Sequence, residues 1–209
     1  MKIFRPGRAP TLIFVALLPF GLTCKTSAIA SDSAKGLPAQ IKKDLQGTIE
    51  AKYSFTDKIG QHVLALTRDS SRLPDGTDNI TLQASLYRFF ENSWKQEWVI
   101  RDFLQCKDLD IEADFFIPLT SFSDLDSNGI TETTVAYRLV CAGGIDTKPT
   151  KVIMRQGTKK FAVRGESLVR IEGALPFGGK FALEPNLDQS PAFKEYLTAV
   201  WNKAAGVNP

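Results

Sequence analysis

The order of hydrophobic and polar positions predicts a mainly β chain with a helix near each end. On the N-terminal side, Leu37, Ile41 and Leu45 recur at helical spacing. Pro38 suits a first helical turn and Gly47 suits an end. We therefore expect a short helix within residues 37–47.

A second helix is expected over residues 190–206. Ser190 can cap its start, Pro191 fits the first helical position, and Gly206 can end it. One apolar stripe runs along this segment, formed by Phe193, Leu197, Val200 and Trp201. A stripe of this kind is typical of core packing.

Between the helices, the pattern is that of strands. Residues 62–67 (HVLALT) form an apolar run of the length of a buried strand. Residues 80–89, 97–103 and 133–141 are also strand-like, with a turn at 91–94. Residues 151–166 read as a tight hairpin with Gly157 in its turn.

Two stretches of the β region resemble each other. SFTDKIGQHVLALT begins at Ser54, and SFSDLDSNGITETTVAY begins at Ser121, 67 residues later. We interpret them as the starts of two related antiparallel β units, near 53–104 and 119–168, each like a propeller blade. A propeller needs about four blades to close, so we expect an open or sandwich-like arrangement.

The first 30 residues have the three parts of a secretory signal peptide. Lys2, Arg5 and Arg8 precede an apolar run of 14 residues, and residues 28–30 (AIA) supply small residues for cleavage. The apolar run is shorter than the roughly 20 residues that span a bilayer. We expect a signal peptide at 1–30, a linker and short helix at 31–48, and one β-rich domain at 49–209.

This expectation places the mature protein in the periplasm or outside the cell, with no transmembrane segment. The alternative is a lipoprotein modified on Cys24. Thr23 and Gly21 do not suit that modification, which calls for a small residue before the cysteine and a leucine three positions before it.

Removing the signal changes the charge. The chain has 26 Lys and Arg and 23 Asp and Glu, and four of the basic residues lie within residues 1–30. The mature chain would carry 22 basic and 23 acidic residues, a net charge of about −1. A nucleic-acid partner, which calls for a basic surface, is therefore not expected.

Cys106 and Cys141 remain after signal removal. An even pair in an exported chain points to a disulfide bond. The alternative is two buried thiols.

Residues 123–132 (SDLDSNGITE) hold the main candidate site. Asp124, Asp126 and Asn128 alternate, Gly129 permits a sharp turn, and Glu132 follows. Calcium prefers six to eight oxygen ligands. We expect one calcium ion bound by side chains of Asp124, Asp126, Asn128 and Glu132 and by the carbonyl of Ile130. A helical calcium hand is excluded, because its twelfth position is Val135; an empty polar turn is the alternative.

A second acidic feature precedes this loop. Asp108, Asp110, Glu112 and Asp114 alternate with apolar residues and would share one face of a strand. Such a face is either simply solvated or attracts cations.

The loop resembles the calcium loops of FG-GAP and VCBS-type repeats, which read D-x-D-x-D-G-x-x-E before a strand, and it departs from them at Asn128. Over residues 94–170, with both cysteines, this loop and the hairpin, the chain is similar to a group of uncharacterised exported bacterial proteins. Some members of that group are described as surface polysaccharide biosynthesis proteins. The resemblance implies an envelope location and a link to glycan or to an envelope protein.

No motif for catalysis stands out. The mature chain has one histidine, His62, within a strand, and it lacks the G-x-S-x-G, H-E-x-x-H and P-loop patterns. The favoured hypothesis is an exported, non-catalytic binding or accessory protein of the cell envelope, stabilised by calcium. The alternative is a periplasmic glycan hydrolase that uses carboxylates.

Overall fold

A computed structural model of the protein describes residues 29–30 and 36–207. Most of the predicted signal peptide lies outside these residues. The exception is strand β1 (Ile29–Ala30), which pairs antiparallel with Tyr53 and Ser54. The described helices include none that is long and apolar enough to cross a membrane.

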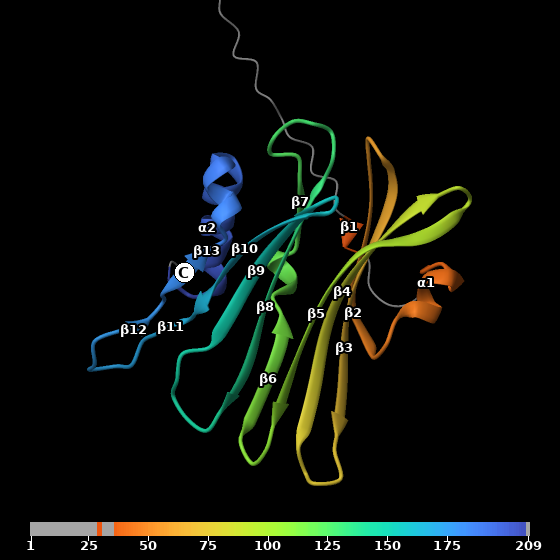
Figure 1. The fold of residues 1–209 in the computed structure, drawn as a ribbon. Coiled ribbons are helices and arrows are strands. Elements are labelled where there is room, and N and C mark those ends of the chain that lie inside the picture. The colour runs from red at the N-terminus through yellow and green to blue at the C-terminus, as the bar shows by residue number, and fades with distance from the viewer. Residues whose placement is uncertain (1–28, 31–35, 208–209) are drawn as a thin grey trace, which may run out of the picture.

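Two antiparallel sheets form the body of the protein (Figure 1), which confirms the predicted fold class. The first sheet has the strand order β1, β2 (Thr48–Asp57), β3 (Gly60–Arg72), β4 (Asp78–Phe90) and β5 (Ser93–Cys106). The second sheet has the order β13 (Phe181–Leu183), β10 (Lys159–Glu166), β9 (Pro149–Gln156), β8 (Glu132–Ala142) and β6 (Asp110–Phe115), and β7 (Ser121–Ser123) also pairs with β8. A small ribbon of β11 (Leu168–Val169) and β12 (Phe177–Gly178) lies beside them.

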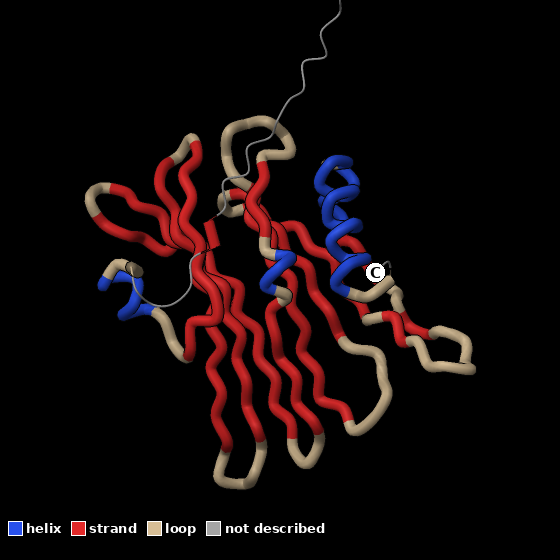
Figure 2. The backbone as a smooth tube through the Cα atoms, turned by 180° about the vertical axis from the view of Figure 1, so that it is seen from behind, coloured by secondary structure: helices blue, strands red, loops and turns tan. Residues whose placement is uncertain are grey.

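Each sheet carries one helix (Figure 2). Helix α1 (Ala39–Asp44) is shorter than predicted, and its Ile41 packs with Val63 and Tyr87 of the first sheet. Helix α2 (Pro191–Ala204) packs on the second sheet through the whole predicted apolar stripe. Short 3-10 helices, η1 (Ile117–Leu119) and η2 (Pro185–Gln189), complete the described elements.

The start of α2 differs from the prediction in one detail. Ser190 is the N-cap residue, but its side chain makes no capping hydrogen bond. Pro191 occupies the first helical position, where its missing N–H costs nothing. The fixed backbone angle of Pro191 thus starts the helix without help from the Ser190 side chain.

The middle of the second sheet is buried on both faces, which explains its apolar runs. Successive residues of a strand point to opposite faces. Along β8 and β9, Val135 and Ile153 face the first sheet, whereas Ala136, Val152 and Met154 face α2. A strand covered on both sides needs few polar positions, so the pattern lacks strict alternation.

The first sheet and the second sheet share one core. Its buried members include Leu64, Leu66 and Leu82 from the first sheet and Val135 and Tyr137 from the second. Within the described residues no strand of one sheet pairs with a strand of the other. The strands of the two sheets are therefore packed through side chains rather than paired through backbone hydrogen bonds.

The two similar sequence stretches lie next to each other in this core. Phe55 of β2 and Phe122 of β7 occupy equivalent positions in the two stretches, and their ring centroids are 4.8 Å apart. Tyr53 also lies against Phe122, with 5.3 Å between centroids. The β2–β3 and β7–β8 connections are thus neighbours, while a common origin of the two units stays a prediction.

The stripe on α2 predicts a large stability effect. Leu197 is fully buried, so Leu197→Ala should lower the free energy of unfolding by about 2–5 kcal/mol, because it removes apolar contacts and leaves a cavity. Urea unfolding followed by circular dichroism measures this. The exposed Glu195 on the same helix provides the control, and Glu195→Ala should change stability by no more than about 0.5 kcal/mol. Equal effects of the two substitutions would contradict the packing of α2.

Candidate metal site

The acidic loop connects β7 to β8 and is shaped by its own side chains. Asp124 Oδ2 accepts a hydrogen bond from Gly129 N at 3.0 Å, and Asn128 Oδ1 accepts one from Ile130 N at 2.7 Å. Ser127 and Gly129 adopt positive φ angles of 55° and 83°. Asx-type turns of this kind reverse the chain within a few residues.

The loop also contacts the first sheet. Lys58 N donates to Gly129 O at 2.9 Å, and Thr131 N donates to Asp57 Oδ2 at 3.0 Å. A Cβ on residue 129 would lie 3.2 Å from the Lys58 side chain, so glycine suits both the turn and the close approach. The loop therefore bridges the two sheets at this end of the molecule.

Three of the predicted ligands come together. Asp124, Asp126 and Glu132 each offer a carboxylate oxygen, and these oxygens lie within 4.8 Å of one another. The two aspartates are exposed, whereas Glu132 is fully buried. This acidic triad could hold a metal ion.

The other two predicted ligands serve the loop itself. Asn128 donates through Nδ2 to Asp126 Oδ2 at 2.9 Å, in addition to its bond with Ile130 N. Ile130 takes part through its amide, and ligation by its carbonyl stays a prediction.

Leu125 explains how the triad is oriented. Its side chain packs against the core beneath α2, which places its amide 2.8 Å from Glu132 Oε2 as a donor. Ser123 Oγ donates to the same oxygen at 3.2 Å. The apolar residue between two aspartates thus anchors the loop over the buried carboxylate.

The electrostatics of Glu132 are unfavourable for a charged group. Burial raises the pKa of the Glu132 carboxyl, and the neighbouring Asp126 and Asp124 raise it further. Hydrogen bonds from Leu125 and Ser123 oppose the shift. A cation among the three carboxylates would relieve both the desolvation and the repulsion.

Gln156 is a member of the site that the sequence analysis missed. From the end of β9, its Nε2 donates to Glu132 Oε1 at 2.7 Å and to Asp126 Oδ2 at 2.9 Å. The amide hydrogens partly offset the negative charge between these carboxylates. Only the pairing of β8 with β9 brings Gln156 here, and no local motif signals that pairing.

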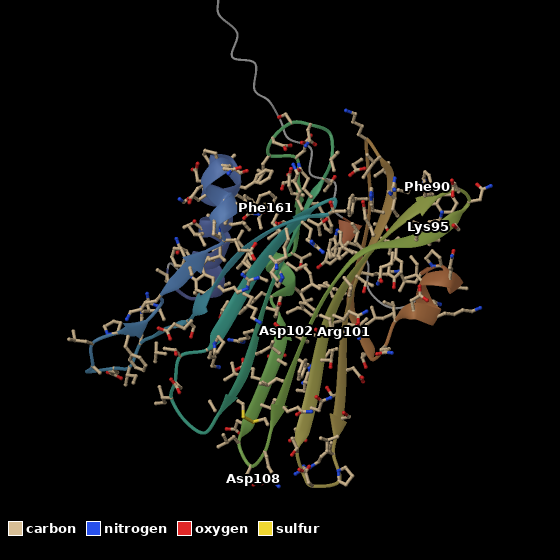
Figure 3. All side chains as sticks on the ribbon, in the orientation of Figure 1. Phe90, Lys95, Arg101, Asp102, Asp108 and Phe161 are labelled. Atoms are coloured by element: carbon tan, nitrogen blue, oxygen red, sulfur yellow. A yellow bond between two sulfur atoms is a disulfide. The ribbon has the colours of Figure 1, made fainter. Side chains whose placement is uncertain are left out.

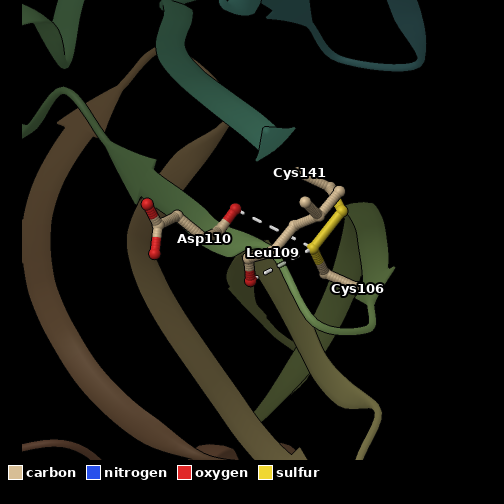
Figure 4. The surroundings of a disulfide bond; sticks show 4 residues. All are labelled: Cys106, Leu109, Asp110 and Cys141. Carbon is tan, nitrogen blue, oxygen red and sulfur yellow. Dashed lines mark hydrogen bonds between the residues drawn. A yellow bond between two sulfur atoms is a disulfide. The ribbon is translucent and has the colours of Figure 1, made fainter. Parts of the chain in front are cut away.

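The predicted disulfide lies at the other end of β8 (Figure 4). The Cys106 and Cys141 sulfurs are 2.04 Å apart and the Cα atoms 5.6 Å apart. Carbonyl oxygens of Leu109 and Asp110 lie 3.6 and 3.8 Å from Cys106 Sγ. Because Cys106 ends β5 and Cys141 belongs to β8, the bond joins the two sheets covalently.

The acidic face of β6 forms as predicted, with one correction. Asp110, Glu112 and Asp114 lie in the strand, but Asp108 lies in the turn before it, with a φ of 57°. Glu112 is bound by Arg138 at 2.7 Å and by Lys148 at 2.6 Å. The middle of this face is therefore neutralised by cations of the chain itself.

His62 occupies a packed position. It is buried and stacked on Phe55, with ring centroids 4.7 Å apart. Its ring nitrogens lie 3.7 Å from Asp57 and 3.5 Å from Glu97.

Comparison of the chain with protein-family models, with curated proteins and with solved structures finds no match in any of the three.

The disulfide gives the second testable prediction. Peptide mapping without reduction should yield one peptide pair joined through Cys106 and Cys141. The double substitution of both cysteines by serine should lower the free energy of unfolding by roughly 3–4 kcal/mol, since it frees a loop spanning 35 residues in the unfolded chain. Ser70→Ala, at an exposed serine of β3, is the control and should change neither result. Recovery of Cys106 and Cys141 as separate free thiols would contradict the pairing.

Proposed function

We propose that this chain is an exported, non-catalytic binding or accessory protein of the cell envelope that binds one calcium ion in the loop at 124–132. The observation that carries the proposal is the acidic triad, in which the fully buried Glu132 lies beside two further carboxylates. Burying a carboxylate without a charge partner is costly. A resident cation would offset that cost.

Calcium suits this site better than a softer metal. The nearby donors are carboxylate, amide and carbonyl oxygens, which hard cations prefer. Imidazole and thiolate, which favour zinc or copper, are not among them: the cysteines form the distant disulfide, and His62 is stacked on Phe55. The side-chain ligands are Asp124, Asp126, Asn128 and Glu132, and Ile130 contributes its carbonyl.

Calcium would act on the contact between the sheets. The loop already bonds to Lys58 and Asp57 of the β2–β3 connection. Fixing the loop with an ion would also fix these contacts. The ion would therefore stabilise the sandwich at the end opposite the disulfide.

Export is supported by two features. The N-terminal sequence has the parts of a signal peptide, and disulfides persist mainly in oxidising compartments. The similarity to exported bacterial proteins supports a role at the envelope, with a glycan or an envelope protein as partner.

A binding role is favoured over carboxylate-dependent hydrolysis. A hydrolase of that kind needs two carboxylates facing one another across the sugar, roughly 5–10 Å apart. Asp102 of β5 is bonded to Lys151 and to Tyr137. Glu112 is likewise bound by two cations. Both carboxylates are therefore engaged in contacts with other side chains of the protein.

Calcium titration tests the proposal. Isothermal calorimetry should show one ion bound per chain, and tenfold excess over Kd should stabilise the protein by about 1.4 kcal/mol, a rise in melting temperature of about 3–6 °C. Asp126→Ala should abolish both effects, because it removes one of the three carboxylates.

Asp69→Ala is the matched control. Asp69 is an exposed carboxylate of β3, away from the loop, so its loss should leave the calcium response unchanged. No binding heat up to about 10 mM calcium, beyond the range of extracellular calcium modules, would contradict the proposal.

A further inference from the structure

A basic cleft lies between the edge of the first sheet and the inner face of the second. Its volume is about 490 Å³. Edge strand β5 forms one wall, with Asp102 at mid-height of the molecule, well away from the Asp108 turn (Figure 3). The other wall consists of the inward residues Lys151 and Arg155 of β9 and Lys160 and Arg164 of β10.

These four cations form two like-charge pairs. The register of β9 with β10 places Lys151 opposite Arg164 and Arg155 opposite Lys160. Directly opposite side chains on antiparallel strands lie about 4.5–5.5 Å apart at Cβ, and like charges there destabilise the sheet. Two such pairs on one small surface are therefore not explained by folding.

The carboxylates of the chain balance only part of this charge. Asp102 bonds to Lys151, and a single oxygen of Glu184 lies 2.9 Å from Arg164 Nη1 and 3.3 Å from Lys160 Nζ. Four cations thus face two carboxylates, which leaves an excess of two positive charges. The shared contact with Glu184 shows that these long side chains converge on one oxyanion.

Arg155 has no carboxylate partner among the described residues. Its guanidinium lies over the Trp98 ring at 5.6 Å, Nη1 donates to Thr158 O at 3.1 Å, and Nε is buried without a hydrogen-bond partner. Burial lowers the pKa of the Arg155 guanidinium, and Glu184 opposes this shift. Stacking on the Trp98 ring holds the Arg155 guanidinium in position, while its Nε–H makes no hydrogen bond.

The opposite wall offers hydrogen bonds to hydroxyl groups. β5 is the edge strand of the first sheet, so one side of its backbone is not paired in that sheet. Across from this edge, Tyr137 of β8 in the second sheet donates through its hydroxyl to Asp102 Oδ2 at 3.2 Å. Burial together with Asp102 raises the pKa of Tyr137, which keeps that hydroxyl protonated. Arg101 also borders the cleft, but it is next to Asp102 in the strand and its side chain therefore points to the other face of the first sheet. There its guanidinium bonds to Gln83 Oε1 of β4 at 2.8 Å, so its charge is not counted with the other four.

We propose that the cleft binds a phosphate monoester of a small hydroxylated molecule, of the sugar-phosphate class. The phosphate dianion matches the excess of two positive charges, whereas a carboxylate would leave one unbalanced. The planar arginine guanidinium can donate two parallel hydrogen bonds to the oxygens of one phosphate. The volume exceeds what a bare phosphate fills, which leaves room for a sugar-sized group against β5.

This inference rests on the proposed binding role and names its ligand class, but it uses no residue of the metal loop. The test is calorimetry of the full-length protein with inorganic phosphate and with glucose 6-phosphate, in the presence of a chelator. Saturable binding of both, tighter for the sugar phosphate, is expected. Glucose alone should not bind.

Single substitutions test whether the sugar phosphate binds in the cleft. Arg155→Gln should weaken the affinity at least about tenfold, the loss of one charged hydrogen-bond donor group, and Arg155→Lys should lie in between. Arg72→Gln is the matched control, since Arg72 is exposed on β3 and lies outside this wall; it should stay within about twofold. Circular dichroism confirms that each variant is folded.

Three outcomes would overturn the inference. These are no saturable binding of glucose 6-phosphate, equal affinity of Arg155→Gln and the unchanged protein, or binding to phosphatidylglycerol vesicles with none to free phosphates. Calcium binding is measured separately, so a protein that binds calcium but not phosphate refutes the cleft alone. A protein that binds phosphate but not calcium refutes the metal site alone.

Discussion

The side-chain core shared by the two sheets is the contact on which the rest of the structure depends. Because no described strand pairs across it, apolar side-chain packing forms the main contact between the sheets. The ends of β8 then restrict sliding: Cys141 is bonded to Cys106 near one end, and the loop that precedes Glu132 bonds to the β2–β3 connection at the other. A calcium ion in that loop would stabilise the contact between the sheets at one end of β8, as the disulfide does near the other end.

Strand β9 contributes one residue to each of the two candidate sites at neighbouring positions. Arg155 and Gln156 are successive residues, so their side chains point to opposite faces. Arg155 lies in the basic cleft between the sheets, whereas Gln156 bridges Asp126 and Glu132 on the other face. Opposite charges thus gather on two faces of one strand end, although the mature chain as a whole would be nearly neutral. The separation allows each site to be changed without altering the other.

Local patterns were enough to predict the two α-helices, the main strands and the cysteine pair. The α2 stripe, the hairpin around Gly157 and the fold class follow from residue spacing that acts over a few positions. Contacts that depend on the pairing of strands far apart in the sequence were not predictable. Gln156 reaches Glu132 only through strand pairing, and the cleft needs the register that sets Arg155 opposite Lys160. The predictions for Ser190 and Asp108 were wrong in detail, because the Ser190 side chain makes no capping hydrogen bond and Asp108 lies in a turn before the strand.

The most direct test of the account is a crystal structure grown with calcium and measured for anomalous scattering. The account predicts one peak among Asp124, Asp126 and Glu132, about 2.3–2.6 Å from their oxygens. The Gln156 amide hydrogens would no longer lie between two carboxylates. An absent peak, with Gln156 Nε2 still 2.7 Å from Glu132 Oε1, would contradict the central claim.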